Sequence, residues 1–392
     1  MTAPPQTPLA GVKVLELARV LAGPWAGQLL ADLGAEVIKV EGPMGDDTRR
    51  WGPPYVSHDD GSRDAAYYHG CNRGKSAIIA DFTKEGDVAR VRALAAEADI
   101  LIENFKVGGL AKYGLDYAAL AEINPRLIYC SITGFGQDGP YAPRPGYDFV
   151  VQGMSGIMDL TGDPAGEPQK IGVAFADVFT GVYATVAIQA ALLMRARTGR
   201  GQHIDMALFD VMTSVLANQA MNALFAAEQG LAGPTRMGNA HPNVAPYAVF
   251  PTNDGWFILA VGNDSQFASA CNVLRLDGVA GDPRFASNGA RIANRTELTE
   301  LLTGATQLWA RDALLDALAK ANVPAGPINR VDEALTDPQI AARGLVQQAV
   351  ARDGKSYPTV MTPIKFSDAR LAEPRASPRL GEDDASIHSF TT

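Results

Sequence analysis

The sequence has few cysteines and histidines and no excess of basic charge. Three cysteines are scattered along 392 residues without a CxxC pair, which is typical of free thiols in a reducing compartment and argues against a disulfide framework or a zinc site. The five histidines show no metal-ligand spacing, so we predict no metal site. The formal net charge of −9 argues against a nucleic-acid partner.

Several motifs of common protein classes are also missing. The loop after the first predicted strand reads ELARVLAGPWAG and lacks the GxGxxG pattern of a nicotinamide dinucleotide site. The chain has no Walker loop, HExxH or GxSxG. Its start lacks the regions of a signal peptide, and its longest apolar run, ATVAIQAALLM, is too short to cross a bilayer. We therefore expect a cytoplasmic protein with no membrane partner.

What is present in the first part of the chain is an alternation of short apolar runs with helical segments. Strand-like runs occupy residues 12–17, 36–41, 76–82, 100–105 and 126–136. This alternation predicts βαβ units and an open parallel sheet of the doubly wound α/β class, with ligands beyond the carboxyl ends of the strands.

The length of the chain predicts two domains, because one hydrophobic core rarely extends beyond 250–300 residues. We predict a large Rossmann-like domain from residues 1–200 and 326–392 and a helical linker at 201–229. A small α+β domain at 230–325 would contain a hairpin, since an Asn-Asp-Gly turn joins two β-type runs there.

One acid stands alone in an apolar stretch. Asp177 is the only carboxylate between Lys170 and Gly199, where a helix is predicted over residues 178–197. Asp is a favoured helix N-cap, and on this segment alone the cap interpretation is the simpler one.

The chain as a whole resembles the class III CoA-transferase family, which also contains the α-methylacyl-CoA racemases. The resembling segments follow one another in order and spacing, among them VKVLELARVLAGPWAG, ENFKVGGLAKYGLD, SITGFGQDGPY and VAFADVFTGVYA. The resemblance implies a Rossmann-like large domain, a smaller domain and an interlocked ring homodimer. It implies that Asp177 is the nucleophile and that no cofactor is permanently bound, since coenzyme A is part of the substrate.

The implied reaction moves CoA from an acyl-CoA donor to a carboxylic acid acceptor, through an aspartyl anhydride and an aspartyl-CoA thioester. By the same resemblance, eight residues match CoA contacts: Val20, Ala22, Asn72, Arg73, Lys75, Asn104, Phe105 and Lys112. A solvated surface charge is the alternative for Lys75 and Lys112. Many members of the family have an arginine where this chain has Gly42, so either Arg49, Arg50 or Arg73 would meet the phosphates instead or the affinity for CoA would be lower.

Substrate choice rests on finer similarities. The segments GDDTRRWGPP and GNAHPNVAPYAVF resemble members that move CoA between succinyl-CoA and short dicarboxylates such as glutarate. Candidate substrate contacts are Arg49, Gln137, Tyr147 and His241; Arg49 and His241 would hold a second carboxylate, although His241 suits a plain loop position equally well.

Three alternatives remain open. A racemase would need a histidine where this chain has Tyr147, and a tyrosine, with its ordinary pKa near ~10, is a poor base at neutral pH. A CoA-binding protein without turnover would not need Asp177. A nicotinamide oxidoreductase would need the dinucleotide loop that is missing.

Overall fold

The computed structural model describes residues 6–390, and the chain divides into two compact units. The large unit comprises Met1–Ile157, Lys170–Ala220 and Pro338–Thr392, and the small unit comprises Met158–Gln169 and Met221–Asp337. Each is described by itself below. Two short helices run across boundaries between these segments, α6 (Ile157–Leu160) and α9 (Asn218–Glu228).

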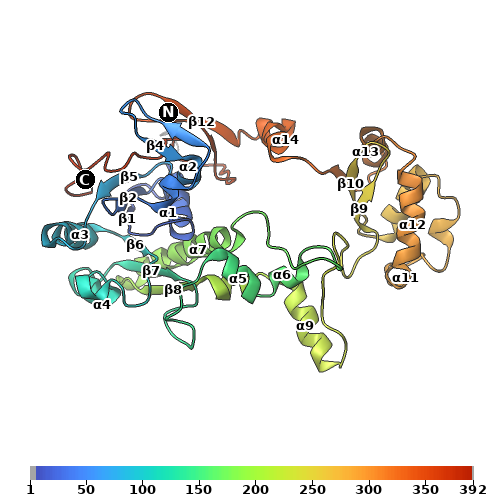
Figure 1. The fold of residues 1–392 in the computed structure, drawn as a ribbon, viewed down its shortest axis with the longest axis horizontal. Helices are drawn as coiled ribbons and strands as arrows, with labels where there is room; N and C mark the ends of the chain where they lie inside the picture. Colours follow the sequence, from blue (N-terminus) through green and yellow to red (C-terminus); the bar gives the residue numbers. More distant parts are fainter. Residues whose placement is uncertain (1–5, 391–392) are drawn as a thin grey trace. The chain divides into compact units, whose positions relative to one another are not determined.

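A six-stranded, fully parallel sheet forms the centre of the large unit (Figure 1). Its strands are β1 (Lys13–Glu16), β2 (Glu36–Glu41), β5 (Ser76–Ile79), β6 (Ile100–Glu103), β7 (Ile128–Thr133) and β8 (His203–Ala207). The predicted mixed α/β class with a large parallel sheet is confirmed. In the order β5-β2-β1-β6-β7-β8, the chain first adds β2 and β5 on one side of β1 and then adds β6, β7 and β8 on the other side. The boundary between β1 and β6 is therefore the topological switch point, where doubly wound sheets bind ligands.

Helices cover both faces of this sheet. Successive strand residues alternate between two separate cores, so that Val14 faces one layer and Leu15 the other. The first layer contains α1 (Ala22–Asp32), α5 (Asp148–Met154), α7 (Phe175–Thr198) and α8 (Leu208–Ser214). The second contains α3 (Glu85–Glu97) and α4 (Tyr117–Ile123).

Smaller elements complete the large unit. They are η1 (Asp47–Arg50), the hairpin of β3 (Tyr55–Ser57) and β4 (Arg63–Ala65), α2 (Ala66–His69), η2 (Ala111–Tyr113), α15 (Pro338–Ala342) and the hairpin of β12 (Val346–Val350) and β13 (Ser356–Val360). The C-terminal segment covers the β5 edge, because the carboxylates of Asp383 and Asp384 accept hydrogen bonds from the N–H groups of Ala77 and Ile79.

The small unit is an α+β structure with its own core. Its antiparallel sheet has the order β11-β10-β9, built from β9 (Tyr247–Pro251), β10 (Trp256–Ala260) and β11 (Ala325–Pro327). The predicted hairpin is thus β9 and β10. Helices α10 (Asp264–Val273), α11 (Asn288–Ala293), α12 (Arg295–Thr306) and α13 (Arg311–Lys320) accompany it, together with η3 (Val279–Gly281) and α14 (Val331–Thr336).

The units differ from the predicted domains in three places. Residues 201–229 are not one helical linker, because β8 pairs with β7 as the edge strand of the large sheet and α8 packs on that sheet. Residues 326–337 belong to the small unit, where β11 pairs with β10. Residues 158–169 join the same unit. These differences arise from pairings between distant segments, which a local pattern does not record.

Helix α7 is the longest described helix, and its apolar surface exceeds what the core covers. Over its 24 residues, an 18-residue window has a mean hydropathy of 1.5 and is only 33% buried, so by length and composition it meets the criteria for a membrane span. The prediction that no segment can cross a bilayer considered only the longest uninterrupted apolar run, whereas α7 as a whole meets the length and composition criteria. Ala184, Ile188 and Ala191 pack in the core, while Val186 and Leu193 are 59% and 71% exposed.

Candidate functional site

Asp177 lies inside the first turn of α7 and does not cap it. The helix begins at Phe175, and its N-cap position is Ala174, which makes no side-chain hydrogen bond to the helix. The predicted N-cap role of Asp177 is therefore wrong. Its side chain faces a cavity at the carboxyl edge of the sheet.

The cap of α7 comes from another helix. The Asp148 carboxylate, at the start of α5, accepts hydrogen bonds from the N–H groups of Ala176 at 2.7 Å and of Asp177 at 3.4 Å. Gln152 holds this carboxylate through a 2.7 Å bond from its Nε2, and its Oε1 accepts the N–H of Ile171 at 2.9 Å. The donors of the first helical turn are thus satisfied without using the Asp177 carboxylate.

The surroundings of Asp177 disfavour its negative charge. Burial raises the pKa of its carboxyl from the ordinary 3.8 to about 7, and the neighbouring Asp148 charge adds to the effect. Apolar residues Val20, Leu21, Ile132 and Leu208 line the same cavity as Asp177. A carboxylate whose charge is disfavoured by its surroundings and that is not used as a cap is available for chemistry.

Close packing of two helices brings α7 to the start of α1. A Cβ atom at Gly181 would lie 2.7 Å from the carbonyl oxygen of Ala22 and 3.0 Å from the Cβ of Trp25. Only a glycine permits this separation. The first turns of α1 and α7 consequently share one cavity, which Ala22 and Asp177 both line.

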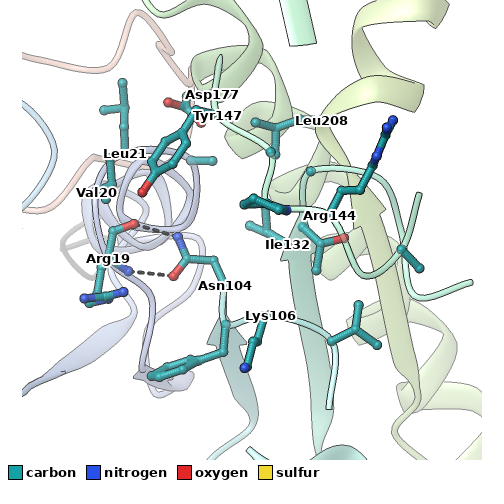
Figure 2. A pocket seen from close by; sticks show the side chains of 18 residues that line it. Arg19, Val20, Leu21, Asn104, Lys106, Ile132, Arg144, Tyr147, Asp177 and Leu208 are labelled. Atoms are coloured by element: carbon teal, nitrogen blue, oxygen red, sulfur yellow. Dashed lines mark hydrogen bonds between the residues drawn. The ribbon is translucent and has the colours of Figure 1, made fainter. Parts of the chain in front are cut away.

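The Asp177 cavity measures about 230 Å³ and lies at the predicted switch point (Figure 2). Its lining comes from the ends of three strands: residues 19–22 follow β1, 104–107 follow β6, and 132–134 end β7. Residues 142 and 144–147 from the next loop, Asp177 and Leu208 complete the wall. Of the predicted contacts, the structure gathers here Val20, Ala22, Asn104, Phe105 and Tyr147.

A second cavity, of about 380 Å³, adjoins the first, and Arg19 and Phe105 line both. We call it the Phe82 cavity, after an aromatic cluster in which the Phe82 ring centre lies 6.2 Å from that of Phe105 and 5.5 Å from that of Tyr113. Gly42 and Arg50 also line it, and a Cβ at Gly42 would meet no atom within 4 Å. The two cavities together extend from the end of β7 to the end of β5.

Four predicted contacts are buried within the large unit instead: Arg49, Asn72, Arg73 and Lys75. None is more than 5% exposed. The Lys75 ammonium contacts Glu16 at 2.8 Å and Asn72 at 2.9 Å, and Arg73 pairs with Asp32.

Arg49 pairs with Glu41 at 2.6 Å and with Asp64 at 3.0 Å. Contact of these four residues with CoA or a substrate stays a prediction, which their burial does not favour. Their charges and polar groups are bound by the protein itself.

The remaining predicted residues are not among those that line the Asp177 cavity. Gln137 lines a different cavity, and its N–H donates to Asp205 at 2.9 Å. Lys112 lies in η2 with its ammonium 4.6 Å from the ring centre of Tyr113. His241 belongs to the small unit, where its Nδ1 accepts the N–H of Asn243 at 3.1 Å.

The sequence analysis missed two neighbours of Asp177. Asp148 follows a Gly-Tyr pair and is the first residue of α5. In the sequence, an acid at this position indicates the start of its own helix, and nothing indicates that it caps α7, whose Asp177 comes 29 residues later. Tyr67 is the other: burial and then the Asp177 charge raise the pKa of its hydroxyl to about 12. Its ring packs edge-on against Trp51, with centres 5.4 Å apart.

Comparison with known proteins gives consistent matches over nearly the whole chain. The model of CoA-transferase family III matches residues 9–384. The succinate–glutarate CoA-transferase of Agrobacterium fabrum is 56% identical over 382 residues, which cover 97% of this chain and 94% of the relative. The human succinyl-CoA:glutarate CoA-transferase is 39% identical, covering 97% and 85%. The crystal structure of a CAIB/BAIF family protein from Brucella suis is 60% identical with a TM-score of 0.88, covering 97% and 98%.

The contact at Gly181 gives a first prediction. Gly181→Ala should lower the free energy of unfolding by about 1–3 kcal/mol, because the new methyl group would overlap a backbone carbonyl. The matched control is Gly304→Ala, in helix α12 with no atom within 4 Å of the added Cβ, which should raise stability by about 0.5–1 kcal/mol. Urea denaturation compares the two, and equal effects would contradict the close-packing argument.

The raised pKa of Asp177 gives a second prediction. Because the unfolded chain loses this proton near pH 4 and the folded chain near pH 7, the carboxyl makes the protein less stable as pH rises through that window. Asp177→Asn removes the effect, so its stability relative to the parent should grow by about 2–3 kcal/mol between pH 5 and pH 8. The same change at Asp312, whose side chain is 83% exposed, serves as the control. A pH-independent difference at Asp177 would show that its charge is not disfavoured.

Proposed function

Because the chain belongs to CoA-transferase family III, we propose that it moves CoA from succinyl-CoA to glutarate or a dicarboxylate of similar length, with Asp177 as the nucleophile. The chain is a CoA-transferase. The observation that carries the mechanism is that the Asp177 carboxylate, which caps no helix, is half-buried in a cavity at the sheet switch point. The 56% identity to a succinate–glutarate enzyme supports the choice of substrates.

Four nucleophilic substitutions make up the proposed cycle. An Asp177 oxygen attacks the thioester carbonyl of the donor, the carbon–sulfur bond breaks, and CoA leaves as a thiolate from a mixed anhydride. The thiolate attacks the carbonyl of Asp177, which releases the donor acid as a carboxylate and leaves an aspartyl-CoA thioester. The acceptor carboxylate then attacks that thioester, and the released thiolate attacks the acceptor side of the new anhydride. Asp177 is regenerated and charge is conserved in each step.

The site suits this chemistry because the cycle needs no proton transfer. Anionic nucleophiles and leaving groups exchange in each step, so no histidine base is required, and the cavity presents Tyr147 where a racemase would need one. The apolar neighbours of Asp177 remove water from the carboxylate and protect an anhydride from hydrolysis. Helix α1 has no side-chain cap, so the free N–H groups of its first turn are suited to stabilising the oxyanion, at about 3 kcal/mol for one donor.

The two joined cavities give a path for CoA. Its thioester end would occupy the Asp177 cavity, whose 230 Å³ cannot hold a complete cofactor-sized molecule. The adenine would lie in the Phe82 cavity among aromatic rings, and the phosphates would lie near Arg19 and Arg50. Arg50, 52% exposed, then replaces the arginine expected at Gly42, because Arg49 and Arg73 are engaged in buried ion pairs.

The exposed apolar surface of α7 supports a homodimer. Val182, Val186 and Leu193 of α7 and Phe149 and Val150 of α5 are between 40% and 71% exposed, an arrangement that a second copy of the chain would cover. This proposal accounts for the membrane-like composition of α7 without a membrane. The interlocked form of the dimer and the cytoplasmic location stay predictions from the sequence.

The exchange reaction tests the proposed function. Incubation with succinyl-CoA and glutarate should give glutaryl-CoA by mass spectrometry, and incubation with succinyl-CoA alone should leave a CoA adduct on the peptide that contains Asp177. Asp177→Ala should abolish both products, a loss of more than about 10³-fold, because no other group replaces the nucleophile.

Controls separate the substrate from the mechanism. Asp148→Asn keeps a hydrogen-bond acceptor for α7 and should leave measurable transfer. Oxalate, with a much shorter spacing between its carboxylates, should be a poorer acceptor than glutarate. Transfer retained by Asp177→Ala would overturn the mechanism, whereas transfer to oxalate in preference to glutarate would overturn only the substrate assignment.

The dimer gives a further prediction. Light scattering after gel filtration should report twice the mass of the 41.5 kDa chain. Val186→Asp would place a charge in the proposed interface and should shift the protein towards monomer or aggregate, while Glu300→Ala on the small unit should not. A monomeric parent protein without detergent would contradict the proposal.

A further inference from the structure

The loop between β1 and α1 is fixed by hydrogen bonds at consecutive backbone groups. The carbonyl of Ala18 accepts a bond from the Lys39 ammonium at 2.9 Å. The amide of Asn104 contacts both the N–H and the carbonyl of Arg19, at 2.8 and 2.7 Å (Figure 2). The carbonyl of Val20 receives the Cys71 thiol at 3.5 Å.

The N–H of Val20 completes this set by donating to both oxygens of Asp46, at 3.3 and 3.2 Å. Val20 itself has a φ of +70°, a left-handed conformation that β-branched residues rarely adopt. Such strain persists only where the surroundings impose it, and it gathers at functional sites. Val20 also lines the Asp177 cavity and comes two residues before the first residue of α1.

Asp46 is itself fixed by buried contacts. It is 1% exposed, and one of its oxygens lies 3.0 Å from the ammonium of Lys39, which is fully buried. Its other oxygen accepts bonds from the N–H and the hydroxyl of Thr48, at 3.0 and 2.8 Å. Its own N–H donates to Glu41 at 2.7 Å. This carboxylate therefore connects the strained loop to ion pairs inside the sheet.

We propose that Asp46, anchored by Lys39, is a positioning residue for CoA transfer: it fixes Val20 in the left-handed conformation and so directs the first turn of α1 at the thioester carbonyl beside Asp177. This inference rests on the proposed function. Asp46 touches no reacting atom. Its effect passes through the backbone of Val20, so it acts on the rate of the chemical steps more than on the binding of CoA.

Steady-state kinetics test the catalytic half of the proposal. Asp46→Ala should lower kcat at least tenfold with less than a threefold change in KM for succinyl-CoA. Asp46→Asn, which keeps an oxygen for the Val20 N–H, should lose less. The matched control is Asp32→Ala, which breaks an equally buried ion pair with Arg73 at the other end of α1 and should leave kcat of the folded enzyme unchanged.

A double-mutant cycle with Val20→Gly tests the conformational half. If Asp46 imposes the strain, Val20→Gly should change the melting temperature more favourably in the parent than in Asp46→Ala, by about 2 °C, because glycine relieves the strain only where it exists. On kcat, Val20→Gly should reduce the parent but add little to Asp46→Ala. Asp46→Asn replaces Asp46→Ala in both cycles if the alanine variant does not fold.

The outcomes separate this inference from the proposed function. A parent enzyme that transfers CoA to no dicarboxylate overturns the proposed function, and the melting cycle still measures the link between Asp46 and Val20. If the parent transfers CoA but the double-mutant cycles are additive, the positioning role alone is overturned. The same holds if Asp46→Ala leaves kcat unchanged. A matching loss of kcat in Asp32→Ala would assign the effect to general destabilisation and overturn it as well.

Discussion

The contact between α1 and α7 at Gly181 is the constraint on which the site depends. It lets the backbone of one helix meet the other, so two helix N-termini open into a single cavity at the sheet switch point. Asp177 then lies beside the uncapped start of α1, while Asp148 of α5 accepts the hydrogen bonds of the first turn of α7. The raised pKa of Asp177 follows from the same packing, because burial is its largest cause.

Beneath this cavity lies a set of buried charges that stabilises the loops around it. Glu16 lies between Lys39 and Lys75 at 3.1 and 2.8 Å, and all three side chains are fully buried. Without a partner each buried charge would be strongly destabilising, and the ion pairs and hydrogen bonds offset part of that desolvation cost. A Cβ at Gly27 would lie 1.8 Å from Glu16, so a second glycine makes room for them. Lys75 and Arg73, which the sequence matches to CoA contacts, form ion pairs in this interior.

The sequence predicted the elements well where the signal was local. The strand-like runs at 36–41 and 100–105, which contain β2 and β6, and the helix around residues 178–197 follow from apolar runs, helix formers and Gly199. It failed at β8, whose five residues HIDMA form a strand only because β7 offers an edge. It also failed to predict the N-terminus of α7, because the group that caps it is Asp148, 29 residues before Asp177 in the chain.

For the site, the sequence by itself determined the family pattern, the choice of Asp177 and the loops after β1 and β6 that line its cavity. Only the tertiary structure decided which charged residues remain available. Arg49, Arg73 and Lys75 were predicted from the sequence to meet CoA or a substrate, and in the structure each is buried beside an acid from a different segment. Ion pairing and burial depend on distances between remote segments, and sequence patterns record only neighbours along the chain.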